Sequence, residues 1–369
     1  DLDDDAQTRF LLRQFILSAA RVAQEFNRLL DEVQPRGVVV FNGVSFPEAV
    51  ARQVALDRGV PVVTHEVGLQ PFSAFFSHGH ATAYPIDVPD DFELSPQQES
   101  RLNGYLEKRF QGQFSMAGIR FWQDMRHLDE GLLAKVAKFR QVVPVFTNVI
   151  FDTSQIHANV IFRDMFAWLE EVLGIIRAHP ETLFVLRAHP DEDRPGKQAR
   201  QSVTLWAEAN QVNELPNVVF IPPREYLSSY ELIQRSKFVM VYNSTIGLEA
   251  SILGSAVLCG GQARYTRLPT VFLPQSAEQF RRMAEEFLNA ERVTAPPEFQ
   301  RNARRFLYYQ LYRASLPFVQ FLDEDVDPGF VILKENLNRW DFLPGSSTTL
   351  TTIVRGVLEG QSFYLPEQD

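Results

Sequence analysis

Cysteine is nearly absent from this sequence. Cys259 is the only cysteine among 369 residues, which excludes an internal disulfide framework and a zinc site built from several thiolates. Chains without disulfides are typical of reducing compartments, so we expect a cytoplasmic protein.

Long apolar runs are missing as well. No stretch approaches the roughly eighteen uninterrupted apolar residues of a membrane-spanning helix, and the acidic residues 1–5 are unlike the basic start of a signal peptide. We therefore expect a chain that neither spans a membrane nor is exported. A peripheral association with the inner face of the membrane, for example through the Phe- and Arg-rich residues 299–318, stays open as an alternative.

Several common functional signatures are also lacking. The sequence has no G-x-G-x-x-G, no Walker loop and no G-x-S-x-G elbow, which argues against dinucleotide-binding, ATPase and ordinary hydrolase functions. The formal net charge of −10 argues against a general nucleic-acid binder, because neutralising phosphates requires a dense basic surface. A small anionic ligand held by a few local groups remains compatible with this balance.

The length and composition favour two α/β domains. Hydrophobic residues make up 45% and charged residues 22% of the chain, and 369 residues divide naturally into domains of roughly 150 residues each. We predict a first lobe at residues 1–140, a second lobe at 141–325, and a last segment, 326–369, that packs back on the first lobe.

The hydrophobic periodicity predicts different patterns in the two lobes. The first lobe shows only two convincing strands, so we expect it to be reduced or truncated; its predicted elements are a helix at 6–33, a strand at 37–41, a helix at 46–58, a strand at 60–63, and helices at 95–110 and 128–139. The second lobe alternates strands and helices in the manner of a doubly wound parallel sheet. Its strands are predicted at 142–147, 182–186, 217–221, 237–242 and 256–259, and its helices at 159–177, 199–210, 228–235 and 246–253. Further helices are predicted at 277–288, 297–316 and 347–358.

The first candidate binding site is the segment Asn243-Ser244-Thr245, which follows an apolar strand and opens a helix. Hydroxyl groups and free backbone N–H groups at this position suit a phosphate. Glu249 lies one turn into the same helix, where a carboxylate can accept hydrogen bonds from a ribose. The alternative is that these residues only cap the helix and complement its dipole.

A second candidate is Arg187-Ala188-His189-Pro190, which comes at the end of a predicted strand. His189 can donate to a phosphate oxygen or protonate a departing one, and Arg187 adds a positive charge. The same four letters occur at residues 177–180, where proline ends a long predicted helix, so we interpret His179 as structural.

Three further groups lie beyond predicted strands. Asn148 and Asp152 follow the first strand of the second lobe and can contact donor or acceptor hydroxyls, although such residues are equally common in turns. Gly260 and Gly261 permit close backbone approach, and Arg264 can balance phosphate charge.

In the first lobe, the residues after the strand at 60–63 are candidates for a general base. Glu66 and His65 are favoured, with His78 and His80 after them. A turn with satisfied polar groups is the competing interpretation.

Taken together, Asp152, the Arg-Ala-His-Pro sequence at 187–190 and the sequence Asn-Ser-Thr-Ile-Gly-Leu-Glu-Ala at 243–250 resemble the capsule polysaccharide biosynthesis family of GT-B glycosyltransferases. The resemblance covers about residues 142–265. The His-Pro pair followed by a Ser-Thr pair is also similar to motifs of bacterial sialyltransferases and Kdo transferases, which implies nucleotide contacts from His189, Ser244 and Thr245. The first lobe departs from the sialyltransferase pattern because it lacks a convincing acidic motif, unless Asp129-Glu130 takes that part.

The resemblance implies a GT-B-like fold, with two Rossmann-like lobes facing a cleft, and a glycosyltransferase that needs neither a cofactor nor a divalent metal. We expect a nucleotide-sugar donor, with a CMP-sugar favoured over UDP, GDP or dTDP sugars, and a glycan or lipid-linked acceptor. Two alternatives stay open: a GT-B-type sugar-nucleotide epimerase, and a non-catalytic sugar-nucleotide-binding or scaffold protein.

Overall fold

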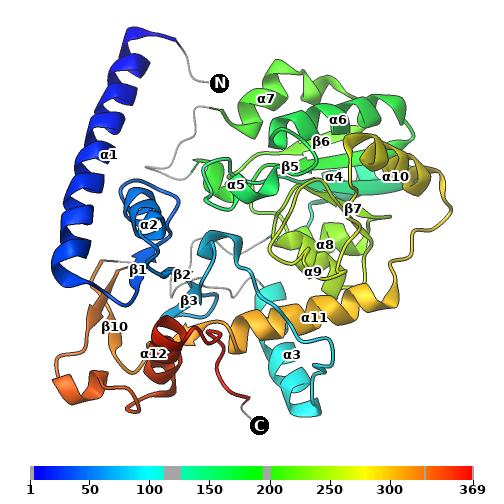
Figure 1. Cartoon of the computed structure of the whole chain (residues 1–369). Helices are drawn as coiled ribbons and strands as arrows, with labels where there is room; N and C mark the ends of the chain where they lie inside the picture. Colours follow the sequence, from blue (N-terminus) through cyan, green and yellow to red (C-terminus); the bar gives the residue numbers. More distant parts are fainter. Residues whose placement is uncertain (1–3, 112–125, 194–200, 328–329, 368–369) are drawn as a thin grey trace. The chain divides into compact units, whose positions relative to one another are not determined.

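The computed structural model of the chain describes residues 4–111, 126–193, 201–327 and 330–367. The chain divides into two compact units, each with its own sheet (Figure 1). The described residues of unit 1 are 4–85, 310–327 and 330–367, and those of unit 2 are 86–111, 126–193 and 201–309.

Unit 2 is built on a five-stranded sheet with the strand order β6-β5-β4-β7-β8. All of its strand pairs are parallel. The strands are β4 (Gln141–Phe146), β5 (Thr182–Arg187), β6 (Val218–Ile221), β7 (Val239–Val241) and β8 (Val257–Cys259). The α-helices are α3 (Pro96–Phe110), α4 (Glu130–Val136), α5 (Gln155–Ala158), α6 (Met165–Ala178), α7 (Val203–Ala209), α8 (Ser229–Gln234), α9 (Ile246–Ile252), α10 (Ala277–Asn289) and α11 (Pro297–Tyr312), and the 3₁₀ turns are η2 (Pro190–Asp193) and η3 (Val212–Glu214).

Helices cover both faces of this sheet, which explains its uninterrupted apolar strands. On one face, α6, α7 and α10 pack on the strands in a core that includes the fully buried Trp168, Phe184 and Phe280. On the other face, α4 and α8 pack through Leu132 and Leu232. The predicted strands and helices of this sheet are therefore confirmed, apart from shifts of a few residues at their ends; residues 199 and 200 of one predicted helix lie outside the described residues.

Unit 1 has a mixed four-stranded sheet with the order β1-β2-β3-β9. β1 and β2 are parallel, and the other two pairs are antiparallel. Its strands are β1 (Val38–Phe41), β2 (Val62–Val67), β3 (Ser73–Ser77) and β9 (Leu316–Pro317), with a separate hairpin of β10 (Leu322–Glu324) and β11 (Val331–Leu333). The helices are α1 (Ala6–Val33), α2 (Glu48–Asp57), η1 (Ala81–Ala83), η4 (Arg339–Phe342) and α12 (Thr348–Glu359).

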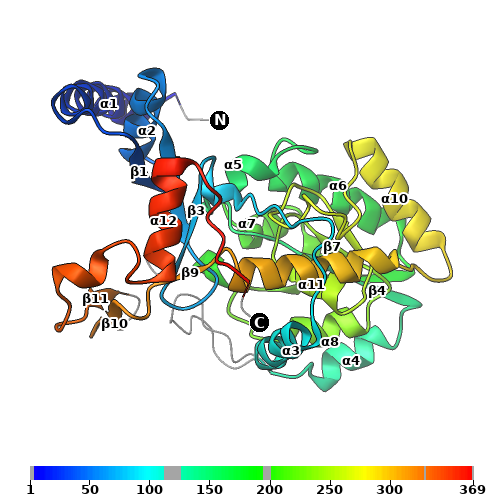
Figure 2. The same ribbon diagram turned by 60° about the horizontal axis from the view of Figure 1, so that its bottom comes forward.

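The β-α-β unit at the start of unit 1 is confirmed, including its Asn-Gly turn. Asn42 and Gly43 have φ angles of 62° and 77°, which asparagine and glycine tolerate best. The prediction of two strands was incomplete, because β2 extends to Val67 and pairs with a strand, β3, in a region expected to be a loop. α12 lies beside this sheet (Figure 2). It packs on the core of the sheet through Ile353 and Val357.

The compact units differ from the predicted division at two places. Residues 86–111 and 126–140, expected in the first lobe, belong to unit 2, and residues 310–325, expected in the second lobe, belong to unit 1. The segment after residue 326 lies in unit 1, where Phe363 and Leu365 join the core.

Two observations concern membranes. Among the described ranges, every helix is too short or too polar to cross a bilayer. The run at 299–318 does not offer an apolar surface, because it forms most of α11 and its Phe306, Leu307 and Tyr308 are buried. This burial gives no support to a membrane contact through the run, and such a contact stays a prediction.

Candidate functional site

Three strand ends of unit 2 meet at one edge of its sheet. Phe146 of β4 is in register with Arg187 of β5 on one side and with Val241 of β7 on the other. Because neighbouring strands lie about 4.8 Å apart, the loops after these residues lie side by side. The strand order also reverses here, since β5 and β6 lie on one side of β4 and β7 and β8 on the other. This is the usual position of a ligand in open α/β sheets.

Two predicted binding residues contact each other across this reversal. The backbone N–H of Asn243 donates to Oδ1 of Asn148 at 3.2 Å, and Nε2 of Gln155 donates to Oδ1 of Asn243 at 3.0 Å. Both asparagines are buried. This hydrogen bond joins the loops after β4 and β7 at the edge where the sequence predicts a ligand.

Ser244 and Thr245 follow Asn243 and lead into α9. Thr245 occupies the N-cap position with a helical backbone, and its side chain makes no capping hydrogen bond. Across the described residues, neither hydroxyl is hydrogen-bonded, and both side chains are half-buried. The alternative interpretation, in which one of these hydroxyls caps the helix, does not describe Thr245.

A tyrosine that the sequence did not single out fixes the position of Ser244. The hydroxyl of the fully buried Tyr265 donates to the Ser244 carbonyl at 2.7 Å. A Cβ at Gly247 would lie 2.3 Å from that hydroxyl, so glycine is required beside it. The sequence distance between these residues hides the contact, which only the folded chain reveals.

His189 lies in the loop after β5, at the same edge of the sheet. Its Nδ1 accepts a hydrogen bond from the backbone N–H of Asp191 at 3.1 Å, so a neutral ring carries its proton on Nε2. Burial has the largest effect on its pKa and lowers it; the carboxylates of Asp191 and Asp152 raise the pKa less, and the charge of Arg187 lowers it again. With a lowered pKa, the imidazole is neutral at pH 7 in the free enzyme. A neutral ring can donate a hydrogen bond to a phosphate oxygen, but it is a poorer proton donor than the charged ring.

Arg187 is the last residue of β5 and is buried. Its Nη1 donates to the Leu227 carbonyl and to the Ser229 hydroxyl. Burial lowers its pKa to about 10, so the guanidinium is charged at neutral pH. Arg187 therefore places a positive charge at the end of β5.

Asp152 and Arg264 lie in the loops after β4 and β8. Asp152 is exposed and its Oδ1 accepts from the Ser154 N–H at 2.9 Å, as in an Asx turn, while its charge still acts on His189. Arg264 is half-buried. The neighbouring glycines serve packing: a Cβ at Gly260 would lie 2.4 Å from the Trp168 ring, and one at Gly261 would lie 2.9 Å from the Ala158 carbonyl oxygen.

Glu249 is buried, and both of its oxygens are engaged. Arg109 of α3 donates through Nε to Oε1 at 2.6 Å, and the Tyr230 hydroxyl donates to Oε2 at 2.6 Å. Neither partner was singled out in the sequence, because each lies on a different helix. A ribose contact from Glu249 stays a prediction and would use the remaining capacity of Oε2.

His179 is held by two carboxylates, as a structural residue would be. It follows the last residue of α6, and its Nδ1 and Nε2 contact Glu181 at 3.0 Å and Glu285 of α10 at 2.7 Å. The predicted position of this Arg-Ala-His-Pro motif at the end of a long helix is confirmed, and the structural role of His179 stays a prediction.

The predicted base residues of unit 1 lie within a strand, which corrects their expected place in a loop. His65 and Glu66 belong to β2. His65 stacks on Phe76 at 5.2 Å and meets Phe41 edge-on, and burial lowers its pKa. Glu66 is buried, and its Oε1 accepts a hydrogen bond from Asn42 Nδ2 at 2.5 Å.

The two further histidines of unit 1 are exposed. His78 contacts the Gln361 carbonyl oxygen at 3.0 Å, and His80 lies 3.4 Å from Nη2 of Arg52. Burial and the Arg52 charge lower the pKa of His80.

Asp129, considered as part of an acidic motif, caps α4 by accepting a hydrogen bond from the N–H of Leu132 at 2.7 Å. In the described segments, no three His, Cys, Asp or Glu side chains gather as a metal site.

Comparison with known families gives one clear result. The family model described as capsule polysaccharide biosynthesis protein matches residues 108–305, which is more than half of the chain. The chain therefore belongs to the capsule polysaccharide biosynthesis protein family, and the resemblance stated from its motifs is confirmed. No curated protein has a matching sequence.

Similarity to solved structures is partial. The β-Kdo 2,4 transferase of Thermosulfurimonas dismutans KpsC is 14% identical, with a TM-score of 0.46 over 76% of this chain and 82% of that chain. The β-Kdo 2,7 transferase of the same protein is 15% identical, with a TM-score of 0.46 over 84% and 85%. The UDP-GlcNAc 2-epimerase of Neisseria meningitidis is 15% identical, with a TM-score of 0.31 over 79% and 80%. These TM-scores are too low to establish a common arrangement over the whole chain.

Proposed function

We propose that this chain is a GT-B-type glycosyltransferase that moves a sugar from a nucleotide-sugar donor to a glycan or lipid-linked acceptor during surface polysaccharide synthesis. One observation carries the proposal: the register of β5, β4 and β7 aligns the strand ends that precede His189, Asn148 and Ser244 along one sheet edge, at the reversal of strand order. Membership of the capsule polysaccharide biosynthesis protein family supports the reaction class.

The donor phosphate would lie against hydrogen-bond donors at this edge. The Nε2–H of His189 and the hydroxyls of Ser244 and Thr245 donate to its oxygens, and Arg187 supplies positive charge. Charge that develops on the departing phosphate is stabilised most by donors already in place. Binding a phosphate also raises the pKa of a neighbouring histidine, so His189 can become the proton donor in the bound state.

The remaining predicted residues have supporting roles in this proposal. Asn148, Asn243 and Asp152 contact sugar hydroxyls, Arg264 contributes charge, and Glu249 contacts the ribose. An acceptor oxygen attacks the anomeric carbon as the bond to the phosphate oxygen breaks. Glu66 of unit 1, with His65 as the second choice, accepts the proton of the acceptor hydroxyl.

The finer details follow from the motifs. The His-Pro and Ser-Thr pairs favour a CMP-sugar over UDP, GDP and dTDP sugars, and they imply a reaction without a divalent metal. We place the protein in the cytoplasm, at the inner face of the membrane when its acceptor is lipid-linked. Its contact with that membrane would use a surface other than residues 299–318, because Phe306, Leu307 and Tyr308 of that run are buried.

A nucleotide-release assay tests the reaction. The protein is incubated with CMP, UDP, GDP and dTDP sugars, each with and without acceptor glycans, in buffer containing EDTA or Mg²⁺. We expect nucleotide release that depends on an acceptor and persists in EDTA. Conversion of the sugar without an acceptor would instead indicate an epimerase, and binding without turnover would indicate a non-catalytic protein.

A further inference from the structure

Arg109 of helix α3 forms a buried ion pair with helix α9, which follows Ser244 and Thr245. Arg109, next to last in α3, donates to Glu249 of α9 through Nε at 2.6 Å, and its Nη2 pairs with the same oxygen. The two side chains are 10% and 4% exposed. An ion pair so well shielded from water is held in one geometry, because either charge alone would be poorly solvated there.

Two tyrosines complete this buried cluster. Tyr230 of α8 donates its hydroxyl to the second oxygen of Glu249, and Nη1 of Arg109 donates to the Tyr105 hydroxyl at 3.1 Å. Burial opposes the charge of Arg109, but the carboxylate of Glu249 outweighs it, so the pKa of Arg109 is raised. Burial and that carboxylate also raise the pKa of Tyr230, which keeps its hydroxyl a donor. The cluster thus ties α3, α8 and α9 together by charge-assisted hydrogen bonds.

The cluster lies one helical turn from the candidate phosphate contacts. The backbone N–H of Glu249 donates to the Thr245 carbonyl at 3.3 Å, so the carboxylate and the Ser-Thr pair are parts of one turn. Replacing a buried ion pair by apolar side chains is often neutral or stabilising, so stability alone is a weak reason for this pair. Fixing the orientation of α9 is the better reason.

We propose that Arg109 is a positioning residue of the nucleotide site: by holding Glu249, it orients the first turn of α9 so that Ser244 and Thr245 face the donor. This inference rests on the proposed function, because it assigns a nucleotide to the Ser-Thr corner. Arg109 itself does not contact the nucleotide.

Substitution of Arg109 tests the inference through a split between kinetic constants. In Arg109→Met we expect the KM for the donor sugar nucleotide and the dissociation constant of the free nucleotide to rise about tenfold or more. Loss of a hydrogen-bond partner that orients a metal ligand has an effect of this size. The acceptor KM stays unchanged. Arg109→Lys keeps the charge and recovers part of the affinity, and Tyr230→Phe, which removes one hydrogen bond, gives a smaller rise.

A double-mutant cycle shows whether Arg109 acts through Glu249. In an enzyme that already carries Glu249→Gln, adding Arg109→Met should raise the donor KM by less than twofold, because the link is already broken. Two independent tenfold effects that multiply would overturn the inference.

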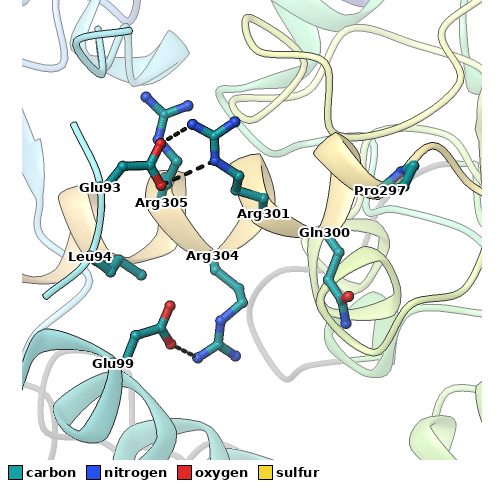
Figure 3. A pocket seen from close by; sticks show the side chains of 8 residues that line it. All are labelled: Glu93, Leu94, Glu99, Pro297, Gln300, Arg301, Arg304 and Arg305. Carbon is teal, nitrogen blue, oxygen red and sulfur yellow. Dashed lines mark hydrogen bonds and ion pairs between the residues drawn. The ribbon is translucent and has the colours of Figure 1, made fainter. Parts of the chain in front are cut away.

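Arg305 provides the matched control for loss of a buried arginine. It lies on α11, beside a hollow of about 260 Å³ that Figure 3 shows, and its guanidinium donates to the carbonyls of Pro89, Asp90 and Phe92 in the segment that precedes α3. Arg305→Met should lower the melting temperature and leave the donor KM of the folded fraction within twofold. An equal rise in donor KM in both variants would mean that a loosened α3 alone explains the effect and would overturn the inference.

The two proposals fail in distinguishable ways. If the wild type binds CMP, UDP, GDP or dTDP in calorimetry but releases no nucleotide from any donor, the transferase proposal fails, and the affinity of Arg109→Met still tests the positioning role. If the wild type turns over and Arg109→Met keeps its donor KM within twofold, only the positioning role fails. Where Arg109→Met does not fold, Arg109→Lys and Tyr230→Phe decide by the same measurement, and a wild type that binds no nucleotide overturns both proposals.

Discussion

The sheets of the two units are buried to different extents. In unit 2, the strands β4 and β5 are buried along almost their entire length, under helices on both faces. In unit 1, the edge strand β1 leaves Val39 and Phe41 45% and 48% exposed, and α1 exposes Phe15 and Ile16 by 56% and 60%. The same kind of apolar run therefore lies inside one unit and at the surface of the other.

This difference explains where the strand-end argument succeeds. In a parallel sheet all strands point the same way, so residues after different strands meet at one edge, as Asn148 and Asn243 do. In unit 1 the antiparallel β3 follows β2 directly, so the chain turns back where a loop was expected, and His65 and Glu66 lie in the pairing region. The proposed donor site in unit 2 thus follows from topology, whereas the proposed base in unit 1 depends on two particular side chains.

The sharpest test of the strand-end argument compares the two Arg-Ala-His-Pro motifs, of which only the one at 187–190 follows a strand. His189→Ala should lower kcat/KM by roughly 10²- to 10³-fold, the usual effect of removing a donor to a developing oxyanion. His179→Ala should lower thermal stability and leave kcat/KM of the folded enzyme unchanged, because the ring nitrogens of His179 contact the carboxylates of Glu181 and Glu285, away from the proposed site. Steady-state kinetics and melting curves of both variants check this; a comparable loss of activity in both would break the distinction.

The role of unit 1 is tested at Glu66. Glu66→Gln keeps the shape and the contact with Asn42 but cannot accept a proton, so we expect kcat to fall about 10²-fold. The dissociation constant of the nucleotide should not change, because the donor edge belongs to unit 2. Retention of full kcat would remove Glu66 as the base, and weakened nucleotide binding would contradict the division of labour between the units.

Close packing at the Ser244 corner is tested at Gly247. Gly247→Ala should destabilise the protein by roughly 1–3 kcal/mol, because its Cβ would overlap the Tyr265 hydroxyl. Tyr265→Phe removes that hydroxyl, so the double variant should recover part of the loss in chemical denaturation. Strict additivity of the two changes would contradict the contact.

The smallest expected effect is the pH dependence of stability at His179. Burial lowers the pKa of His179, but hydrogen bonds and charges from Glu181 and Glu285 outweigh it and raise the pKa overall. A raised pKa stabilises the folded state below the ordinary value of 6.5 and loses that stabilisation as the pH rises through the folded-state pKa. The free energy of unfolding of the wild type relative to His179→Gln, from chemical denaturation, should therefore be greatest near pH ~5.5 and decline toward pH ~8, by at most about 1 kcal/mol. An advantage that grows with pH would reverse the sign and refute this account.

The sequence by itself determined the alternation of strands and helices in unit 2, because strands buried on both faces read as uninterrupted apolar runs. It also determined that Asn148, His189 and Ser244 share a sheet edge, since each follows a strand of one parallel sheet. The position of His179 at the end of a long helix followed from the proline after it.

Only the tertiary structure decided the rest. The hairpin of β2 and β3 carries buried polar and aromatic side chains such as Thr64, Glu66 and Phe75. Its sequence therefore lacks the regular alternation of apolar and polar residues that predicts a strand. The partners of Glu249 come from two other helices, one of them 140 positions away along the chain, and local sequence patterns carry no information about such contacts. Hydrophobic periodicity indicates which face of a helix or strand is buried. The distant side chains that contact this face depend on how the helices and strands pack together.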